Sequence, residues 1–249
     1  SVQHRVRPDL TQQVGVAGVA NRPGGYSNHM AASLAPLLST CGGIIHAMRA
    51  DRRERAQQEA LRQHADHARF LAEASITLAT FTTAGEIFAF IRSSVPTILP
   101  GVITNTGRTT DDGGHLEVVD IQGADDSLIA RAIAALGLDP RGRRFAVLDR
   151  FREIYARTRL HRHEEGLADF AASVLPRAVS AVVERLLGLR TIYTIGIADA
   201  GRTYGHLHVF VTEAGSTVDT VLVESFVHLC SLALARTASR VALQESEES

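Results

Sequence analysis

No proline or glycine interrupts the sequence between Ile44 and Thr83. Each of them weakens a helix interior, by about 1 kcal/mol for glycine and about 3 kcal/mol for proline, so the run favours one continuous helix. Apolar residues recur at helical spacing in two stripes: Leu34, Leu37, Leu38, Cys41, Ile44, Ile45 and Met48, then Leu61, Ala65, Ala68, Leu71 and Leu78. The segment between the stripes, Asp51–Glu59, is polar, as in a helix that bridges two packed bodies. We predict a connector helix from about Asn28 to Thr83.

Beyond this helix the sequence changes to shorter elements. The stretch "AGEIFAFIRSSVPTILP" predicts a short helix stopped by its prolines, and two hairpins and a long closing helix follow. Turn and cap residues separate these elements: Pro96 and Pro100, Asp112-Gly113-Gly114, Asp125, Gly137, Pro176 and Ala200-Gly201. The order of helix, strands, helices, strands and helix predicts an α+β fold rather than alternating βαβ units.

Two distant parts of the chain resemble each other. The stretch "GVAGVANRPGGY…LAPLLSTCGGIIHAMRADRR" parallels "YGHLHVFVTEAG…VESFVHLCSLALARTASR", and each is a glycine-led strand, a turn and a helix with a central cysteine. We therefore predict that residues 1–50 are the last strand and helix of a truncated first copy, that residues 51–80 are the connector, and that residues 81–249 are a complete second copy. The strand expected at residues 12–22 would then be disordered or paired with another molecule, because its sheet neighbours are missing.

These same stretches resemble a known family. "GVAGVANRPGGYSNHMAASLAPLLSTCGGIIHAMRADRR" is similar to the end of a GAF domain, and "LGLRTIYTIGIADAGRTYGHLHVFV…VESFVHLCSLALAR" resembles the same end in GAF-like domains of archaeal-type sensor histidine kinases. The resemblance implies a GAF/PAS-like, six-stranded antiparallel sheet. One face would carry the terminal helices, and the other could form a small-molecule pocket. It also implies tandem sensing domains upstream of a kinase, although no kinase core follows the closing helix here.

Composition limits the partners and the compartment. The net charge of −1 gives no strong attraction to nucleic acid or to anionic membranes. No apolar run approaches the roughly 20 residues of a membrane-spanning helix, and the first residues, "SVQHRVRPDL", lack the apolar core of a signal peptide. The two cysteines are far apart, which excludes a disulfide framework or a CxxC metal site. We expect a cytoplasmic protein without nucleic-acid partners or membrane insertion.

Histidines provide the candidate polar contacts. His206 and His208 lie two apart on a predicted strand, so both point to one face, with Leu207 and Val209 on the other. They could contact a ligand, a metal or a haem, but two ligands are too few for a metal site, and ordinary sheet-face histidines are the alternative. A second pair, His161 and His163, lies in a charged segment that is either solvated or a lid over an anionic ligand.

The predicted pocket lies between the sheet and the middle helices. Phe145, Phe151 and Tyr155 supply aromatic lining, and the face of Tyr193, or the opposite face, supplies the floor. Period-two alternation leaves open which face points inward. The candidate ligand-binding residues are therefore Phe145, Phe151, Tyr155, Tyr193, His206 and His208.

Catalytic chemistry finds little support in the sequence. There is no Gly-x-Ser-x-Gly elbow, and two distant cysteines cannot form the cluster that GAF-type methionine sulfoxide reductases require. Cys230 is either a small core residue or a redox or haem-linked thiol, since some archaeal GAF sensors are thought to use a cysteine for haem. No catalytic residue and no metal ligand are assigned, and haem is the one named cofactor candidate.

These observations predict a non-catalytic sensory module of a two-component signalling protein. It would bind a small molecule of unknown identity, form a homodimer through its helices, and relay the signal along them. The alternative is a dimerisation scaffold without a ligand. The two hypotheses differ in the pocket, because a sensor needs a concave, mainly apolar cavity and a scaffold fills that space with its own side chains.

Overall fold

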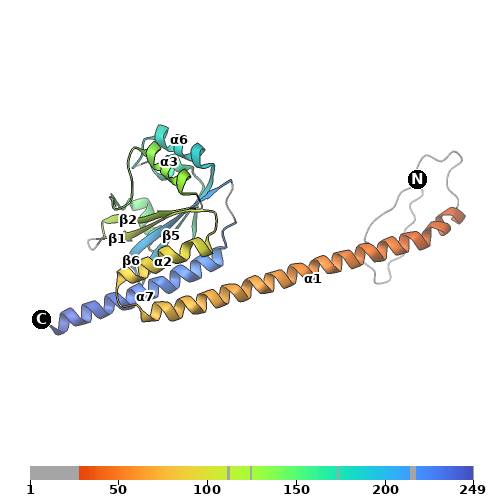
Figure 1. The fold of residues 1–249 in the computed structure, drawn as a ribbon, viewed down its shortest axis with the longest axis horizontal. Coiled ribbons are helices and arrows are strands. Elements are labelled where there is room, and N and C mark those ends of the chain that lie inside the picture. The colour runs from red at the N-terminus through yellow and green to blue at the C-terminus, as the bar shows by residue number, and fades with distance from the viewer. Residues whose placement is uncertain (1–27, 111–112, 124, 173, 214–216, 249) are drawn as a thin grey trace. The chain divides into compact units, whose positions relative to one another are not determined.

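The computed structural model describes residues 28–110, 113–123, 125–172, 174–213 and 217–248 (Figure 1). The described residues form seven helices: α1 (Asn28–Thr80), α2 (Ala84–Ile98), α3 (Asp126–Leu136), α4 (Asp149–Tyr155), α5 (Leu167–Phe170), α6 (Arg177–Leu187) and α7 (Thr220–Glu247). They also form six strands: β1 (Ile103–Thr109), β2 (His115–Gln122), β3 (Arg144–Ala146), β4 (His161–His163), β5 (Leu189–Asp199) and β6 (Arg202–Thr212).

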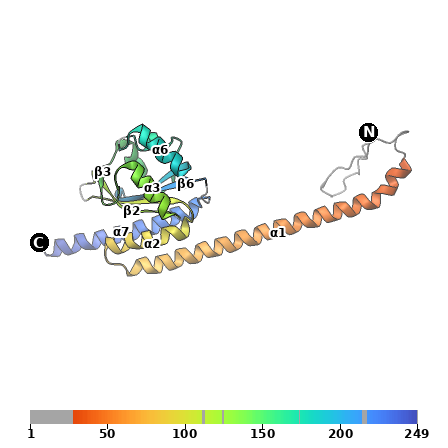
Figure 2. The same ribbon diagram turned by 45° about the horizontal axis from the view of Figure 1, so that its top comes forward.

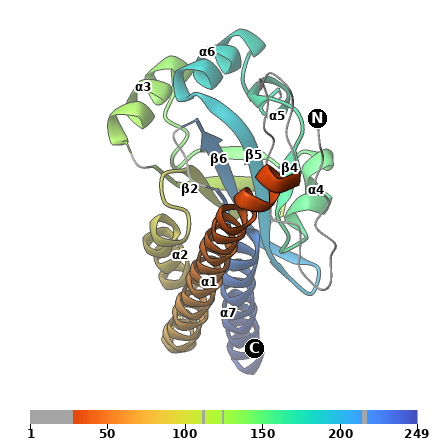
Figure 3. The same ribbon diagram turned by 90° about the vertical axis from the view of Figure 1, so that its right-hand side faces the viewer.

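The strands make one sheet in the order β3-β2-β1-β6-β5-β4, and every neighbouring pair is antiparallel. The first and last parts of the domain therefore meet at the centre of the sheet, where β1 pairs with β6. Helices α2 and α7 lie on one face, and α3 and α6 lie on the other (Figures 2 and 3). The predicted α+β class with a six-stranded antiparallel sheet is confirmed.

Helix α1 confirms the predicted long helix and ends three residues earlier than expected, at Thr80. The chain divides into two compact units within this helix, one up to Ala68 and one from Arg69 onwards. In the first unit the apolar side chains of Leu37, Ile44 and Met48 are all more than half exposed, at 59%, 55% and 52%. The strand predicted at residues 12–22, which belongs to the truncated copy, lies outside the described residues.

The second unit has its main hydrophobic core on the face covered by α2 and α7. Phe226, Val223 and Cys230 of α7 are fully buried against Ile195 and Leu207 of the sheet. The last turns of α1 join this core, since the Phe70 ring lies 5.6 Å from that of Phe226. Helix α7 is also long and apolar enough to cross a membrane by length and composition alone, but half of its most apolar window is buried in the protein, and this packing accounts for its composition.

Local sequence signals place the element ends. Asp125 caps α3 by accepting hydrogen bonds from two backbone N–H groups, and Gly137 ends it in the left-handed conformation, as predicted. The β5–β6 turn has Ala200 and Gly201 at positive φ, which suits a two-residue hairpin. One expectation was wrong in part: α2 is not stopped by Pro96 but continues two residues further to Ile98, and it ends before Pro100. A proline in the last turn removes only one backbone hydrogen bond of the helix.

Candidate ligand-binding cavity

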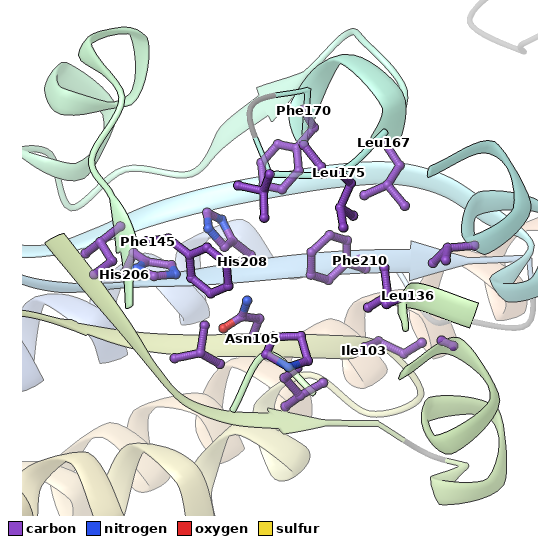
Figure 4. A pocket seen from close by; sticks show the side chains of 18 of the residues that line it. Ile103, Asn105, Leu136, Phe145, Leu167, Phe170, Leu175, His206, His208 and Phe210 are labelled. Carbon is purple, nitrogen blue, oxygen red and sulfur yellow. The ribbon is translucent and has the colours of Figure 1, made fainter. Parts of the chain in front are cut away.

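A cavity of ≈ 220 Å³ lies on the sheet face opposite α2 and α7 (Figure 4). Strands β1, β2 and β6 form its floor, and α3, β3, α4, α5 and α6 supply its walls. Most of the lining is aliphatic or aromatic: Ile103, Leu116, Val118, Ile129, Ile133, Leu136, Phe145, Phe151, Leu167, Phe170, Leu175, Val183 and Phe210 are among its residues. Space of this kind is unusual in a close-packed protein interior and is typical of a binding site.

The polar side chains of the cavity gather at one end. Figure 4 shows Asn105, His206 and His208 near Phe145, with Phe210 and Leu136 toward the opposite end. The strand register places Asn105 of β1 opposite His208 of β6, and His206 lies two residues away along β6 on the same face. The cavity thus has an apolar end and an end with neutral polar groups.

Two glycines allow close approaches to the sheet beside His206. Gly107 on β1 and Gly196 on β5 lie opposite it on the two neighbouring strands. A Cβ atom at Gly107 would come within 2.2 Å of the His206 ring, and one at Gly196 would come within 2.0 Å of the Tyr155 carbonyl oxygen. The imidazole and helix α4 therefore approach the sheet more closely than any other residue at these positions would allow.

His208 belongs to a chain of hydrogen bonds that leads from the cavity to the sheet edge. Tyr155 Oη lies 3.3 Å from His208 Nε2, and Thr194 Oγ1 lies 2.8 Å from both His208 Nδ1 and His163 Nε2. A neutral imidazole has one donor and one acceptor nitrogen, so this chain is satisfied in either direction. Both ring nitrogens of His208 therefore have hydrogen-bond partners within the protein.

His206 differs from His208 in this respect. It is 2% exposed, and among the described residues its Nδ1 has no hydrogen-bond partner. Asn105 Oδ1 is likewise buried and without a partner in the described part of the chain. Buried polar atoms are nearly always bonded, so two such atoms on one cavity wall call for an explanation.

Burial keeps the ionisable groups of the cavity neutral. Desolvation lowers the pKa of His206 to about 3 and that of His208 well below its usual value. Outside the cavity lining, desolvation, with His161 and Arg150 nearby, lowers the pKa of His163 to about 4. Burial also raises the pKa of the Tyr155 phenol, which stays protonated. No charged residue lines the cavity among those that the structure describes.

Comparison with known proteins finds similar structures at low sequence identity. The chromophore-binding domain of a bacteriophytochrome from R. palustris has 16% identity and a TM-score of 0.47, and the match covers 74% of this chain and 63% of that one. The GAF domain of the cyanobacteriochrome TePixJ has 16% identity and a TM-score of 0.44, and the match covers 65% of this chain and 94% of that one. A domain of a putative two-component sensor histidine kinase from Sinorhizobium meliloti 1021 has 11% identity and a TM-score of 0.42, and the match covers 66% of this chain and 99% of that one.

No family model and no curated protein matches the chain. Its own topology has every feature that the sequence resemblance implied: six antiparallel strands, terminal helices on one face, and a cavity on the other. The fold is GAF-like. The match with the bacteriophytochrome domain spans 63% of the length of that domain.

The GAF-like domain brings most of the candidate residues together. Phe145, Phe151, Tyr155, His206 and His208 all line the cavity. Tyr193 does not, because it lies on the opposite face of β5 and packs against the helical core. The sheet-face ambiguity is thereby resolved: Leu207 and Val209 meet the helices, and the intervening histidines point into the cavity.

The other sequence candidates lie elsewhere in the domain. His161 and His163 form the edge strand β4 rather than a lid, and Arg157 and Arg159 border a separate shallow hollow beside Asp199. Cys230 lies in the helical core on the far face of the sheet, where burial raises the pKa of its thiol. This placement supports the core interpretation of Cys230.

Sequence reasoning missed three residues of the site. Asn105 lines the polar end from β1, and Thr194 of β5 holds His208 by a hydrogen bond without lining the cavity. Phe170 contacts both His163 and His208, with ring centroids 4.9 and 5.0 Å away. One signal was available for Asn105, a polar side chain that alternates with Ile103 on the inward face of a predicted strand. Phe170 lies on a four-residue helix, α5, with no periodicity to reveal it.

The cavity does not fit a haem. Its described lining offers no arginine or lysine for the two propionates, and its ≈ 220 Å³ is about one and a half times the roughly 150 Å³ that benzene occupies in an engineered cavity. Cys230 is separated from it by the sheet. Within the described residues there is also no group of three or more His, Cys, Asp or Glu side chains that could hold a metal ion.

Proposed function

We propose that this chain is a non-catalytic sensory module that binds a small molecule in its GAF-like cavity and relays the change to helices on the other face of the sheet. The observation that carries this proposal is the cavity, an apolar space of ≈ 220 Å³ with neutral polar groups at one end. A scaffold without a ligand would gain stability by filling such a space with its own side chains.

Strand β6 supplies a physical route for the relay. Its residues alternate between the two faces, with His206 and His208 in the cavity and Leu207 and Val209 in the core that contains α7. A ligand that displaces the histidines must also displace their chain neighbours, which pack against the helix. Small shifts of this kind are converted into discrete helix movements because packed cores do not deform continuously.

The output of the module is proposed to pass through paired helices. The exposed apolar stripe of α1, with Leu37, Ile44 and Met48, would be buried by the same stripe of a second copy, with two-fold symmetry as the default. In the parent protein these helices would lead to a further signalling domain, such as the histidine kinase that the sequence resemblance implies.

Naphthalene is a suitable probe for the cavity. The chain has no tryptophan, so naphthalene fluorescence can be followed with little background. We expect one naphthalene to bind per chain and to change amide hydrogen exchange in α7 as well as around the cavity. Ala132→Leu fills the cavity from α3 and should abolish binding, whereas Ala130→Leu, the same substitution at an exposed position of that helix, should not.

Failure of naphthalene to bind, or equal binding by both leucine variants, would contradict ligand binding in this cavity. Binding without any change in α7 would support a binding module and contradict the relay.

Helix pairing has a separate test. Light scattering at micromolar concentration should give the mass of a dimer for the chain and a monomer for the Leu37→Glu, Ile44→Glu double variant. A monomer for the unchanged chain, or a dimer that survives both substitutions, rules out pairing through this stripe.

A further inference from the structure

The proposed function leaves the chemical class of the ligand open, and the two unpartnered atoms at the polar end of the cavity narrow it. His206 Nδ1 and Asn105 Oδ1 are buried, and neither has a hydrogen-bond partner among the described residues. Both residues line the cavity. A third such atom, Thr109 Oγ1, belongs to a residue outside the lining.

We propose that the cavity selects an uncharged molecule about the size of two fused rings that carries one hydroxyl, or an equivalent neutral group, held by His206 and Asn105. This inference rests on the proposed function, because it specifies the ligand of the same cavity.

Size sets the first part of the proposal. An engineered apolar cavity of about 150 Å³ takes one benzene ring. The present cavity of ≈ 220 Å³ has room for a second fused ring but not for a nucleotide with its sugar and phosphates. Phe145, Phe170 and Phe210 border this space (Figure 4), and aromatic walls favour a flat ligand through offset or edge-to-face contacts.

Charge sets the second part. The described lining has no arginine, lysine, aspartate or glutamate, so a charged ligand would lose its hydration without gaining an ionic partner. His206 is not a hidden cation, because desolvation lowers its pKa to about 3 and the imidazole is neutral at pH 7. Carboxylates, phosphates and amines are therefore disfavoured.

Hydrogen bonding sets the third part. The Asn105 carbonyl oxygen can only accept, whereas a neutral His206 offers either a donor or an acceptor at Nδ1. A hydroxyl donates one hydrogen bond and accepts others, so it pairs with both atoms when His206 carries its proton on Nδ1: it accepts from this N–H and donates to Asn105 Oδ1. If Nδ1 is unprotonated, the single hydroxyl hydrogen serves only one of these two acceptors. The hydroxyl also satisfies the asparagine if its amide is rotated by 180°, since the nitrogen would then donate. Ligands without such a group leave both protein atoms unpaired.

A matched series of probes tests the proposal on the full chain at pH 7: naphthalene, 2-naphthol and 2-naphthoate. These share one ring system and differ in the group at one position. We expect 2-naphthol to bind about tenfold more tightly than naphthalene, which corresponds to ~1.4 kcal/mol. We expect 2-naphthoate to bind more weakly than naphthalene.

Two variants locate the preference. His206→Phe and Asn105→Leu each remove one of the polar groups and keep a side chain of similar shape. Each should reduce the preference for 2-naphthol, measured as the ratio of the two affinities in the same variant, toward onefold. Tyr193→Phe removes a hydroxyl from the opposite face of the sheet and is the matched control, for which the preference should remain.

The outcomes separate this inference from the proposed function. Equal binding of naphthalene and 2-naphthol, or a preference that survives in both variants, overturns the inference and leaves ligand binding intact. Tightest binding of 2-naphthoate overturns it through the charge argument. If none of the three probes binds, both the inference and the proposed function are wrong. The two variants are independent, so a folding defect in one leaves the other to decide.

Discussion

The two faces of the sheet use the same strand for different purposes. On β6, Leu207 and Val209 are fully buried in the core beneath α2 and α7, whereas His206 and His208 border a cavity. Successive residues of one strand thus belong to a filled face and a hollow face. Alternation lets a domain place its stabilising contacts and its binding contacts on one strand without mixing them.

The covering elements explain why one face is filled and the other is not. Helix α7 spans 28 residues and α2 spans 15, so each lays a continuous apolar side on the sheet. The cavity face is covered by shorter pieces, of which β3 has three residues and α5 has four. Short elements joined by loops meet the sheet at several angles, and their side chains enclose space rather than interlock.

The largest expected contrast is in the removal of aromatic rings. Phe226→Ala should lower the free energy of unfolding by about 3–5 kcal/mol, because a fully buried ring leaves a new void in a filled core. Phe210→Ala should lower it by less than half as much, since Phe210 already borders a cavity. Urea unfolding followed by circular dichroism measures both. Equal losses would show that the two faces are packed alike.

Acid sensitivity is expected to come from the cavity face. The folded-state pKa of His206 is about 3, against about 6.5 in an unfolded chain, so between these values the unfolded state binds the extra proton. Stability contributed by the neutral form is complete above about pH 6.5 and is lost as the pH falls. Between pH 7 and pH 5, the free energy of unfolding should therefore fall by about 2 kcal/mol less for His206→Phe than for the unchanged chain, as measured by urea unfolding at each pH.

The control for acid sensitivity is Asn105→Leu, which alters the same cavity without removing a titrating group. Its unfolding free energy should depend on pH as that of the unchanged chain does. The buried-histidine account would fail if His206→Phe showed that same dependence as well.

Enlarging a side chain should have opposite consequences on the two faces. Cys230→Leu inserts extra carbon into a filled core and should cost about 1–3 kcal/mol. Ala132→Leu extends into the cavity and should leave the unfolding free energy unchanged or slightly raised. Thermal unfolding of the two variants side by side is sufficient. A destabilised Ala132→Leu together with a neutral Cys230→Leu would reverse the assignment of the faces.

The last expected contrast concerns the hydrogen bonds that join Tyr155, His208, Thr194 and His163. Thr194→Val removes the hydroxyl between His208 and His163 and should lower the unfolding free energy by about 1–3 kcal/mol if His208 Nδ1 is left unpaired. Naphthalene affinity should change little, because Thr194 is outside the cavity lining. If Thr194→Val lost naphthalene binding as completely as Ala132→Leu, the hydrogen bonds of His208, rather than the side chains of the walls, would maintain the cavity.

Local patterns in the sequence were sufficient for much of the fold. The long helix followed from the absence of breakers before Thr83, the β5–β6 hairpin from Ala200-Gly201, and the bounds of α3 from Asp125 and Gly137. Each of these depends on residues within a few positions of one another. Alternation likewise placed His206 and His208 on a common face.

The arrangement of the site depended on contacts that the sequence does not encode locally. Which face of β6 is hollow depends on where α7 packs. The sequence does not tell which face α7 covers, and the prediction of Tyr193 as a cavity residue was wrong for this reason. The contact of His163 with Thr194 joins residues 31 apart through the register of a three-residue edge strand. Asn105 becomes significant only once β1 is known to lie beside β6.

Diffraction from crystals of the chain soaked with 6-bromo-2-naphthol tests the central claim most directly, because the bromine marks one end of the ligand and its anomalous signal fixes the orientation. The account predicts one bromine site at the apolar end of the cavity, near Phe210 and Leu136, with the hydroxyl between His206 and Asn105. Ligand density on the α2–α7 face or only on the protein surface, or an empty cavity at concentrations that saturate binding in solution, would contradict it.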